Sequence, residues 1–504
     1  MQELAAELVR RAEENPDDVA VVDAEGRHTV AEIVAAAREL AGILEERLGG
    51  SPTVLVQADN SWRTLTAAVA VGLRGGLISV FSRHAPSSEF EFAVADLRPD
   101  AVVAADDSLE QWGVGTEAFP GRAQALRGWT VAVGGGPVSD VARWKGGSVV
   151  AMTSGSTGRP KCVVQSEAAL IYAGRSTIDI VGLQPGDPVA GLVPLSSVAA
   201  FCFGMYLPAL NGSPAVLLDR WSPQVAVELM KEHRVAWTML VPTMALQLSR
   251  QPGAEGALNA TRAMTVGGGP MDAGALERAE VLLGTRILRV FGMSECLGHT
   301  TPRIDETPEI RLGRDGRPFP GTIVRAVESD GRVCATGKVG LAQVKGPSLF
   351  VGYARDGVPV PPDLTEDGFL PTGDLVEVFD DGTIRVAGRQ KQLVIRGGRN
   401  IDINEVESAI ARMPSIAQVC VVPVPDELLG ERVAALIVAL DSEPSLPDVT
   451  AFLQDIGLSK SKWPEYVYCV PDLPQNRVGK LSRQDAVRLA TELAKNDLSS
   501  SRVG

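Results

Sequence analysis

The chain has 504 residues, which is too long for one hydrophobic core, because single cores stop growing at roughly 250–300 residues. Apolar residues make up 45% of it and charged residues 22%, the profile of a globular protein rather than a disordered or fibrous one. The formal net charge of -14 argues against a sequence-independent hold on nucleic acid or on an anionic membrane, since both need a basic surface. We therefore expect two or more domains and a small-molecule substrate.

The sequence carries no sign of export or of membrane insertion. Residues 1–10 are partly acidic and lack the basic and apolar regions of a signal peptide. Uninterrupted apolar stretches of about 18 residues, which a membrane-spanning helix needs, are missing. The six cysteines lie far apart without a CxxC pair, and we expect reduced, mostly buried thiols. These features predict a cytoplasmic protein with no membrane span.

The first half of the chain alternates strand-like apolar runs with helical patterns. The early elements are expected at residues 53–57, 62–73, 77–81, 89–95 and 101–104. Later strands are expected at residues 188–193, 214–218 and 236–241, with a helix at 224–233. Strands that alternate with helices at this spacing indicate parallel βαβ units and a doubly wound α/β sheet.

The second half changes character twice. From about residue 313 short strands and turns dominate, and the hairpin or loop signals are Asp330-Gly331, Asp381-Gly382 and Gly397-Gly398. From about residue 388 we expect a strand at 392–395, a helix at 403–413 capped by Asn404 or Asp402, a strand at 417–422 and a helix at 447–456. Residues 497–504 are polar and are expected to fray.

These patterns predict an α/β fold of two unequal domains. Residues 1–389 would form a large N-terminal domain of doubly wound α/β subdomains plus a β-rich subdomain. Residues 390–504 would form a small, mobile α+β C-terminal domain.

The densest chemical signal is a Gly/Ser/Thr-rich loop that follows the apolar run 148–151. Its glycines let the backbone approach an anion, its hydroxyls are neutral donors, and its lysine adds a positive charge. A solvated linker is the alternative, but a linker seldom begins at a strand end and seldom closes with Arg-Pro-Lys. The predicted phosphate-binding residues are Thr153, Ser154, Gly155, Ser156, Thr157, Gly158 and Lys161.

This loop is not the Walker loop G-x-x-x-x-G-K-[ST]. The segment nearest to that pattern, Gly331 to Lys338, has a longer glycine spacing, and Val339 follows its lysine. We expect that segment to be a turn between strands.

The loop is one of a series of motifs that strongly resembles the adenylate-forming superfamily of acyl- and aryl-CoA ligases, luciferases and nonribosomal peptide adenylation domains. The other blocks follow in the family's order and are Gly267-Gly268-Gly269-Pro270, Phe291-Gly292-Met293-Ser294-Glu295, Gly316-Arg317-Pro318-Phe319-Pro320-Gly321, Gly346-Pro347-Ser348, Pro371-Thr372-Gly373-Asp374-Leu375, Gly388-Arg389, Gly397-Gly398-Arg399-Asn400-Ile401 with Asn404-Glu405-Val406-Glu407, and Pro474-Gln475-Asn476-Arg477-Val478-Gly479-Lys480. The resemblance implies an enzyme that joins a carboxylic acid to ATP as an acyl-AMP.

A carboxylate that attacks the α-phosphate of ATP must overcome charge repulsion, so the site needs Mg²⁺ and cationic donors. The resemblance implies that Glu295 lies near the Mg²⁺ ion, that Asp374 accepts both ribose hydroxyls, and that Arg389 makes a second ribose contact. The residues implied in binding adenine and the rest of the nucleotide are Gly267, Gly268, Gly269, Phe291, Gly292, Met293 and Ser294. A surface Glu or a turn Asp is the alternative for the isolated acidic residues.

Lys480 matches the family lysine that reaches from the small domain to the α-phosphate and the substrate carboxylate. A Lys after Gly in a polar loop is usually only solvated, but the preceding motif favours the catalytic role. Lys391 falls at the family's hinge between domains. Rotation there would bring Gly397 and Gly398 toward the thiol once the adenylate has formed.

The predicted acid pocket is almost wholly apolar and atypical at its entrance. Many CoA ligases carry an aromatic residue and a His where this chain has Ser196-Ser197. The segments expected to form the pocket are 198–205, 239–244, 266–269 and 293–298, and the predicted side chains are Ser197, Val198, Phe201, Thr243, Val266 and Leu297. A second free charge on the acid would be buried unpaired at a cost of several kcal/mol. We expect an aromatic, alicyclic or medium-chain acid, although ordinary core packing would produce similar patterns.

Coenzyme A is the expected acceptor, because neither an anchor for an amino acid's α-amino group nor a carrier-protein segment is found. Transfer to a carrier protein, an amine or an inorganic nucleophile such as nitrite is the first alternative. A nucleotide-binding protein that has lost the chemistry is the second, and retention of Lys161, Glu295, Asp374, Arg389 and Lys480 argues against it. We expect a monomer or homodimer.

Overall fold

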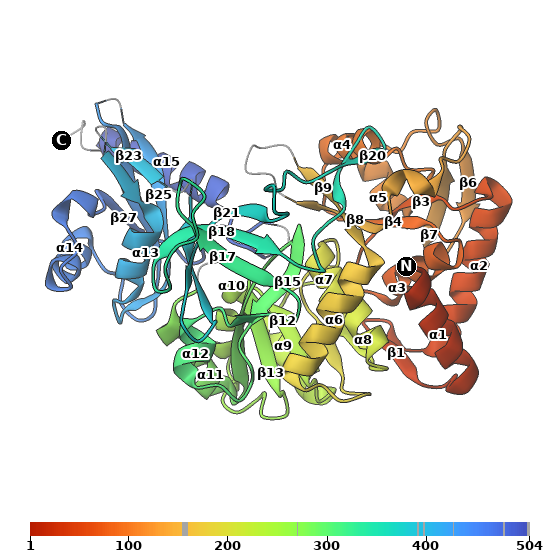
Figure 1. The fold of residues 1–504 in the computed structure, drawn as a ribbon, viewed down its shortest axis with the longest axis horizontal. Coiled ribbons are helices and arrows are strands. Elements are labelled where there is room, and N and C mark those ends of the chain that lie inside the picture. The colour runs from red at the N-terminus through yellow and green to blue at the C-terminus, as the bar shows by residue number, and fades with distance from the viewer. Residues whose placement is uncertain are drawn as a thin grey trace.

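The computed structural model describes residues 1–153, 160–269, 271–390, 393–396, 399–426, 428–476 and 479–500 (Figure 1). The strands of these residues form two nine-stranded sheets, one four-stranded sheet and one five-stranded sheet. The first three sheets belong to a large N-terminal domain and the last to a small C-terminal domain. The predicted fold class is confirmed.

One nine-stranded sheet, here called sheet B, has the order β20-β19-β9-β8-β4-β3-β5-β7-β6. Its centre is parallel and is made of β3 (Thr53–Gln57), β4 (Leu77–Phe81), β5 (Ala101–Ala105) and β8 (Gly147–Thr153). Its flanks are antiparallel and are made of β6 (Gly121–Gln124), β7 (Trp129–Val133), β9 (Lys161–Ser166), β19 (Gly352–Arg355) and β20 (Val358–Val360). The strands predicted near residues 53, 77 and 101 are therefore confirmed.

The other nine-stranded sheet, sheet A, has the order β16-β15-β14-β13-β12-β10-β11-β1-β2. Its parallel strands are β1 (Val19–Asp23), β10 (Val189–Gly191), β11 (Ala215–Leu217), β12 (Trp237–Leu240), β13 (Ala263–Gly267) and β14 (Arg286–Met293). The antiparallel edge strands are β2 (Gly26–Thr29), β15 (Cys296–Thr301) and β16 (Arg317–Pro318). The three later strands predicted from the sequence all lie in this sheet.

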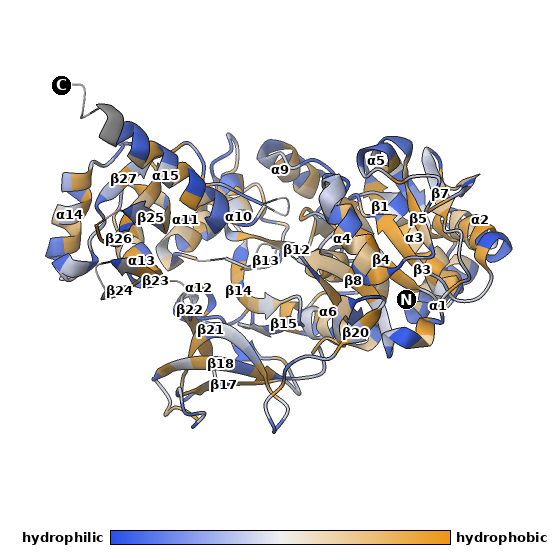
Figure 2. Ribbon diagram, turned by 90° about the horizontal axis from the view of Figure 1, so that it is seen from above, coloured by the Kyte–Doolittle hydropathy of each residue, from blue (hydrophilic) through white to orange (hydrophobic). Residues whose placement is uncertain are grey.

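One large apolar core joins the two sheets, as the hydrophobic strands and inward helix faces of Figure 2 show. Val56 and Ile78 of sheet B and Ala190 and Val216 of sheet A are buried in it together. The helices of this domain are α1 (Gln2–Glu14), α2 (Val30–Leu48), α3 (Trp62–Leu73), α4 (Ser87–Leu97), α5 (Asp106–Gln111), α6 (Glu167–Val181), α7 (Val198–Phe201), α8 (Leu207–Leu210), α9 (Pro223–Glu232), α10 (Pro242–Ser249), α11 (Ala273–Leu283) and α12 (Pro308–Gly313). A π-helical turn, Cys202–Tyr206, joins α7 to α8.

The β-rich subdomain is an antiparallel sheet in the order β17-β18-β21-β22. Its strands are β17 (Ile323–Val327), β18 (Val339–Lys345), β21 (Leu370–Val378) and β22 (Ile384–Arg389). Gly331 and Gly382 sit in the turns at φ values of 87° and 78°, which a glycine adopts without strain. Both predicted turns are confirmed, and the segment from Gly331 to Lys338 connects β17 to β18.

The C-terminal domain packs helices on both faces of its sheet. Its elements are β23 (Leu393–Arg396), β24 (Arg399–Asp402), α13 (Ile403–Ala411), β25 (Ile416–Asp426), β26 (Gly430–Ala439), α14 (Leu446–Asp455), β27 (Tyr466–Cys469) and α15 (Arg483–Ser500). Asp402 caps α13 by accepting a hydrogen bond from the Asn404 backbone N–H at 2.8 Å, so it is the cap of the two candidates.

The chain remains helical beyond residue 497, where the sequence predicted that fraying would begin. Helix α15 continues to Ser500, and Tyr468 donates a hydrogen bond to Asp497 at 2.9 Å. Residues 501–504 lie outside the described part of the chain. The six cysteines are free, and Cys162, Cys202, Cys296 and Cys420 are buried, as expected. Among the described residues, every helix is too short or too polar to cross a membrane.

A buried ion pair joins sheet A to the β-rich subdomain. Arg289 of β14 donates to both carboxylate oxygens of Asp315, at 3.0 and 3.2 Å. Asp315 also accepts a hydrogen bond from the Val386 N–H of β22 at 2.7 Å. Since both side chains are buried, the pair fixes the position of β22 relative to β14.

Asp315→Asn tests this junction, because it removes the charge that faces Arg289 and keeps the shape of the side chain. Leaving one charge of a buried pair uncompensated costs about 3–5 kcal/mol. We expect the free energy of unfolding to fall by that amount in urea denaturation followed by tryptophan fluorescence. Asp305→Asn is the matched control, since Asp305 pairs with Arg303 at 3.6 Å and the side chains are 75% and 71% exposed. Equal losses in the two variants would contradict the role of Asp315.

Candidate active site

The phosphate loop predicted from the sequence leaves sheet B between β8 and β9. Thr153 and Lys161 are paired across these two antiparallel strands, so they form the two ends of the loop. Between them, Ser154, Gly155, Ser156, Thr157 and Gly158 lie outside the described residues. Their contact with phosphate stays a prediction, and Lys161 is fixed by its strand.

Tyr353 connects Lys161 to Glu295. Its hydroxyl donates a hydrogen bond to Glu295 Oε1 at 2.8 Å, and Lys161 Nζ lies 4.8 Å from the centroid of its ring. Burial and the Glu295 carboxylate raise the pKa of Tyr353 above its ordinary value, so the phenol stays protonated. Tyr353 was not predicted from the sequence. Its place in β19, where it pairs with Val163 just beyond Lys161, results from a strand contact between distant segments.

The segment Gly292 to Glu295 is held by backbone contacts at the hairpin between β14 and β15. Gln165 of β9 donates to the Ser294 carbonyl oxygen at 2.9 Å and to the Ser348 carbonyl oxygen at 3.2 Å. The Phe350 N–H donates to the Glu295 carbonyl oxygen at 2.9 Å. A Cβ at Gly292 would lie 2.9 Å from the Gly298 nitrogen, so this position needs glycine. Met293, in the same hairpin, pairs with Cys296.

Phe291 packs edge-to-face against the buried His299, with ring centroids 4.5 Å apart. Burial lowers the pKa of His299 to about 4, although its Nδ1 lies 2.9 Å from the Cys296 carbonyl oxygen. The imidazole is therefore neutral near pH 7. A neutral ring supports Phe291 without adding a charge to the site.

Asp374 and Arg389 face each other across β21 and β22. The Arg389 Nε donates to Asp374 Oδ1 at 3.0 Å, and the Asp374 side chain is 7% exposed whereas that of Arg389 is 61% exposed. Burial raises the pKa of Asp374, and the Arg389 charge partly offsets this effect. The pair therefore combines a buried carboxylate, on Asp374, with a mostly exposed guanidinium group, on Arg389.

Lys480 of the C-terminal domain reaches this group of residues. A Cβ built on Gly268 would lie 2.8 Å from Lys480 Nζ, so the lysine side chain passes directly over the Gly268 backbone. Burial and the positive charge of Arg389 lower the pKa of Lys480, while Glu295 acts in the opposite sense. The structure therefore brings Lys480 together with Gly268, Arg389 and Glu295.

The glycine run that follows β13 lies beside this lysine. Gly268 has a φ of 83°, and a Cβ at Gly267 would lie 2.4 Å from the Val290 carbonyl oxygen, so neither position accepts a side chain easily. A Cβ at Gly269 would meet only Pro242, at 3.6 Å. The predicted hinge residue Lys391 and the predicted thiol-side residues Gly397 and Gly398 lie outside the described residues.

A narrow pocket adjoins the site behind β14. Its lining residues are Thr177, Phe203, Trp237, Met239, Thr265, Val290, Gly298, Thr301 and Phe319. Phe203 and Trp237 meet edge-to-face, and Trp237 Nε1 donates to Thr265 Oγ1 at 2.8 Å. Val290 directly precedes Phe291 in β14, so the pocket lies along the strand that carries this predicted nucleotide-binding residue.

The side chains that line this pocket are neighbours of those predicted. Val198, Phe201, Val266 and Leu297 have no exposed surface and pack in the core between the sheets. The Ser197 hydroxyl accepts a hydrogen bond from the Ala200 N–H and so caps α7. Phe203, within the π-helical turn Cys202–Tyr206, lines the pocket, whereas the buried Phe201 before the turn does not.

Thr243 contacts the C-terminal domain, and its predicted role in the acid pocket stays a prediction. Its hydroxyl donates a hydrogen bond to the Gly479 carbonyl oxygen at 2.9 Å. Thr243 therefore lies at the contact between the two domains.

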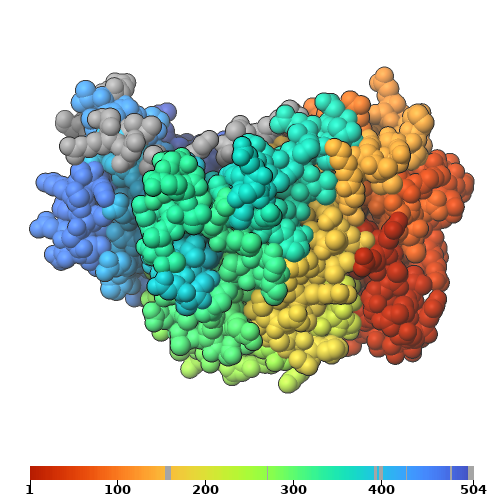
Figure 3. Space-filling view, in the orientation of Figure 1, coloured from red at the N-terminus to blue at the C-terminus, as the bar shows by residue number. Residues whose placement is uncertain are grey.

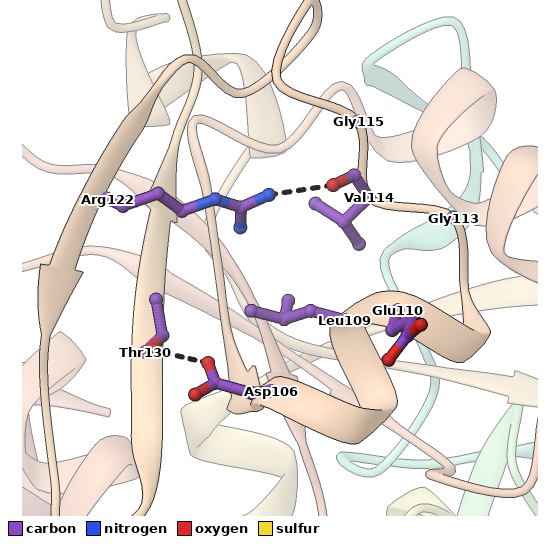
Figure 4. Close-up of a pocket in the computed structure, with 8 residues that line it drawn as sticks. All are labelled: Asp106, Leu109, Glu110, Gly113, Val114, Gly115, Arg122 and Thr130. Carbon is purple, nitrogen blue, oxygen red and sulfur yellow. Dashed lines mark hydrogen bonds between the residues drawn. The ribbon is translucent and has the colours of Figure 1, made fainter.

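A wider hollow of about 440 Å³ lies elsewhere, between α5 and the edge strands β6 and β7 (Figure 4). Arg122 donates to the Val114 carbonyl oxygen at 2.7 Å, and Thr130 donates to Asp106 at 2.7 Å. In Figure 1 these elements lie at the end of the molecule opposite the C-terminal domain. None of the residues predicted for the active site lines this hollow.

The AMP-binding enzyme family matches residues 8–354, and the AMP-binding enzyme C-terminal domain matches residues 405–480. The chain belongs to this family. It is 30% identical over 511 residues to pyochelin synthase PchD of Pseudomonas aeruginosa, with 98% of this chain and 93% of that protein covered. It is 29% identical over 524 residues to a Streptomyces protein named salicylyl-CoA synthase / salicylate adenylyltransferase, with 96% and 94% covered. The ATP-bound structure of MatB from Rhodopseudomonas palustris has a TM-score of 0.83 and 25% identity, with 97% and 99% covered.

Family membership confirms the resemblance inferred from the motifs. The protein is an adenylate-forming, acid-activating ligase that uses ATP. The boundary at residues 389 and 390 falls between the two family matches and stays a prediction.

The contact between Tyr353 and Glu295 leads to a test by nucleotide binding. Tyr353→Phe keeps the ring beside Lys161 and removes the hydroxyl that orients Glu295. A hydrogen bond to a charged group contributes roughly 1.5–3 kcal/mol, so we expect ATP affinity with Mg²⁺ to fall about tenfold or more. Affinity in EDTA should stay near that of the wild type, as measured by isothermal titration calorimetry.

Tyr353→Leu is the matched comparison, because it also removes the ring that Lys161 contacts. We expect this variant to bind ATP more weakly both with Mg²⁺ and in EDTA. If Tyr353→Phe weakened binding equally in the two conditions, the hydroxyl would not act through Glu295.

Proposed function

We propose that the protein activates an aromatic, alicyclic or medium-chain carboxylic acid as an acyl-AMP and then transfers the acyl group to coenzyme A. The observation that carries the proposal is the position of Lys480, which lies over Gly268 beside Arg389 and Glu295 although it comes from the other domain. A half-buried lysine whose pKa is affected by neighbouring charged side chains suits a step in which negative charge gathers on phosphate.

The proposed reaction has two steps at one site. First, a carboxylate oxygen bonds to the α-phosphorus of ATP, and the bond from that phosphorus to the bridging oxygen breaks, so pyrophosphate leaves. Next, the sulfur of coenzyme A bonds to the acyl carbon, the bond from that carbon to the phosphate oxygen breaks, and AMP leaves. The thiol proton passes to solvent. In this scheme Lys480 serves the first step and the residues around Gly397 and Gly398 the second, after rotation near Lys391.

Glu295 is the residue proposed to hold Mg²⁺. Among the described residues no group of three or more His, Cys, Asp or Glu side chains could hold a metal ion by itself. Magnesium in nucleotide enzymes typically takes one or two carboxylates together with phosphate oxygens and water, so a single Glu fits it. Glu295 is held by a neutral hydroxyl, which leaves its charge for a cation. When bound, Mg²⁺ would neutralise charge on the phosphates.

The remaining nucleotide contacts are proposed from the same geometry. The Asp374 carboxylate beside Arg389 suits the two ribose hydroxyls, since a carboxylate accepts several hydrogen bonds. Phe291 and the backbone of Gly267 to Gly269 would hold adenine. Residues 153–158 and Lys161 would hold the phosphates.

An aromatic acid is favoured within the proposed class by the chemistry of the side chains behind β14, and its binding would require the pocket there, which measures about 10 Å³, to widen. The residues that line the pocket behind β14 are apolar or carry neutral hydroxyl groups, and Phe203, Trp237 and Phe319 present aromatic rings to it. A Cβ on Gly298 would lie 2.7 Å from Phe203 Cζ, so this ring limits the depth of the pocket. The relative named salicylyl-CoA synthase / salicylate adenylyltransferase supports an aryl acid and coenzyme A. A carrier protein, an amine or an inorganic nucleophile is the alternative acceptor.

A pyrophosphate-release assay over a panel of acids tests the proposal. We expect release to require the acid, ATP and Mg²⁺, with benzoate-type acids ahead of dicarboxylates, because a second carboxylate would be buried unpaired. Product analysis with coenzyme A, amines and nitrite then identifies the acceptor. If a dicarboxylate such as malonate were the best substrate, the assignment of the acid to an apolar pocket would be wrong.

Lys480→Ala separates the two steps. Removing one positioned charge commonly costs about 10²–10³ in rate, so we expect acid-dependent pyrophosphate release to fall by that factor. Conversion of a supplied acyl-AMP to its thioester should stay close to the wild-type rate, since the domain is expected to have turned by then. Collapse of both steps in a folded variant would contradict the assignment of Lys480 to the first step.

A further inference from the structure

The two domains touch through a short polar contact directly beside Lys480. We propose that Thr243 is a positioning residue, which holds the Gly479–Lys480 peptide and thereby places the Lys480 side chain over Gly268. The Thr243 hydroxyl donates to the Gly479 carbonyl oxygen at 2.9 Å, across a sequence separation of 236 residues. This inference rests on the proposed function for the role of Lys480 and on the observed contact for the role of Thr243.

Thr243 is itself held firmly. It lies in the first turn of α10, which begins with Pro242 immediately after β12, and its residue surface is 7% exposed. The proline fixes its own φ at the start of the helix, so the backbone there has little freedom. The Thr243 hydroxyl is therefore a hydrogen-bond donor whose position is well defined.

Gly479 fits closely against the same turn. Its φ is 74°, and a Cβ built on it would lie 3.3 Å from Met244 Sδ and 3.5 Å from Val241 Cγ2. The loop from the C-terminal domain therefore meets a notch formed by Val241, Thr243 and Met244. Glycine at position 479 permits both the positive φ and the close approach of the loop backbone to this notch.

The peptide unit between Gly479 and Lys480 is held at both of its polar groups. Its carbonyl accepts from Thr243, and its N–H, on Lys480, donates to Asn476 Oδ1 at 2.9 Å. Because a peptide unit is planar, fixing its C=O and its N–H also fixes the Cα of Lys480. Thr243 holds this unit from the N-terminal domain, and Asn476 holds it from within the loop.

Chemical labelling of Lys480 tests the contact without relying on activity. We would treat the full-length protein with an amine-reactive reagent and follow each lysine by peptide mass spectrometry, with the exposed Lys231 of α9 as the internal reference. Thr243→Val keeps the shape of the side chain and loses the donor, whereas Thr243→Ser keeps the donor. A typical net hydrogen bond contributes about 1 kcal/mol, or about fivefold in an opening equilibrium. We expect Lys480 to react about fivefold faster in Thr243→Val and at the wild-type rate in Thr243→Ser.

The rate of acid-dependent pyrophosphate release provides a second test of the contact. In Thr243→Val, acid-dependent pyrophosphate release should fall about fivefold, with ATP affinity and the unfolding midpoint unchanged. Asn476→Ala, at the other end of the same peptide unit, should change labelling and release in the same direction, and it decides the question if Thr243→Val does not fold. A purely structural role for Thr243 would shift the unfolding midpoint without a selective change at Lys480.

Unchanged labelling of Lys480 in a folded Thr243→Val variant would overturn the proposal. So would faster labelling of Lys231 and Lys480 to the same extent, because that pattern reports general loosening. If the wild-type protein released no pyrophosphate with any acid, the proposed function would fail, and the labelling comparison would still decide whether Thr243 positions Lys480.

Discussion

The buried carboxylate of Asp315 sets the geometry on which the site depends. It pairs with Arg289 of β14 and accepts from the Val386 N–H of β22, so one side chain fixes two strands from different sheets. Strand β14 leads to Phe291 and Glu295, whereas β22 ends at Arg389 opposite Asp374. The proposed adenine and metal side of the site and the proposed ribose side are therefore held in position relative to each other by a buried charge, and electrostatic interactions are strongest away from solvent.

Three cationic side chains lie in the candidate site, on Lys161, Arg389 and Lys480, and the neutral side chain of Tyr353 contacts one of them. Lys161 lies against the ring of Tyr353, and Glu295 accepts from the hydroxyl of the same residue, so the Tyr353 hydroxyl supplies Glu295 with a neutral partner. Arg389 is mostly exposed and Lys480 is half-buried, and their mutual repulsion contributes to the lowered pKa of Lys480. Such an arrangement is costly for the protein alone and favourable once a polyanion enters, which is a general property of preorganised sites.

The sequence predicted those features that depend on local pattern. Alternation of strands and helices located the parallel strands, and turn glycines such as Gly331 and Gly382 located the hairpins, because both signals lie within a few residues. Side-chain directions in the pocket could not be predicted, since Phe203 lies within the π-helical turn Cys202–Tyr206, which leaves no mark in the residue pattern. Tyr353 and the contact of Thr243 with the C-terminal domain were missed because their partners, Glu295 and Gly479, are distant in sequence. Fraying was predicted from residue 497 because the contact of Asp497 with Tyr468 is likewise non-local.

Glycine backbones take part in several described contacts between the domains. Lys480 crosses Gly268, Gly479 fits against the start of α10, and a Cβ on Gly388 would lie 2.4 Å from Asn404 Nδ2 of α13. Figure 3 shows the C-terminal domain against the side of the large domain, at one end of the molecule. Contacts of backbone against side chain define position closely, because closely packed atoms tolerate little displacement. The Arg389 charge also lowers the pKa of Lys480, so the two cations repel each other near this contact. A bound anion near both would add an electrostatic attraction to these contacts, in keeping with the two-step scheme proposed above.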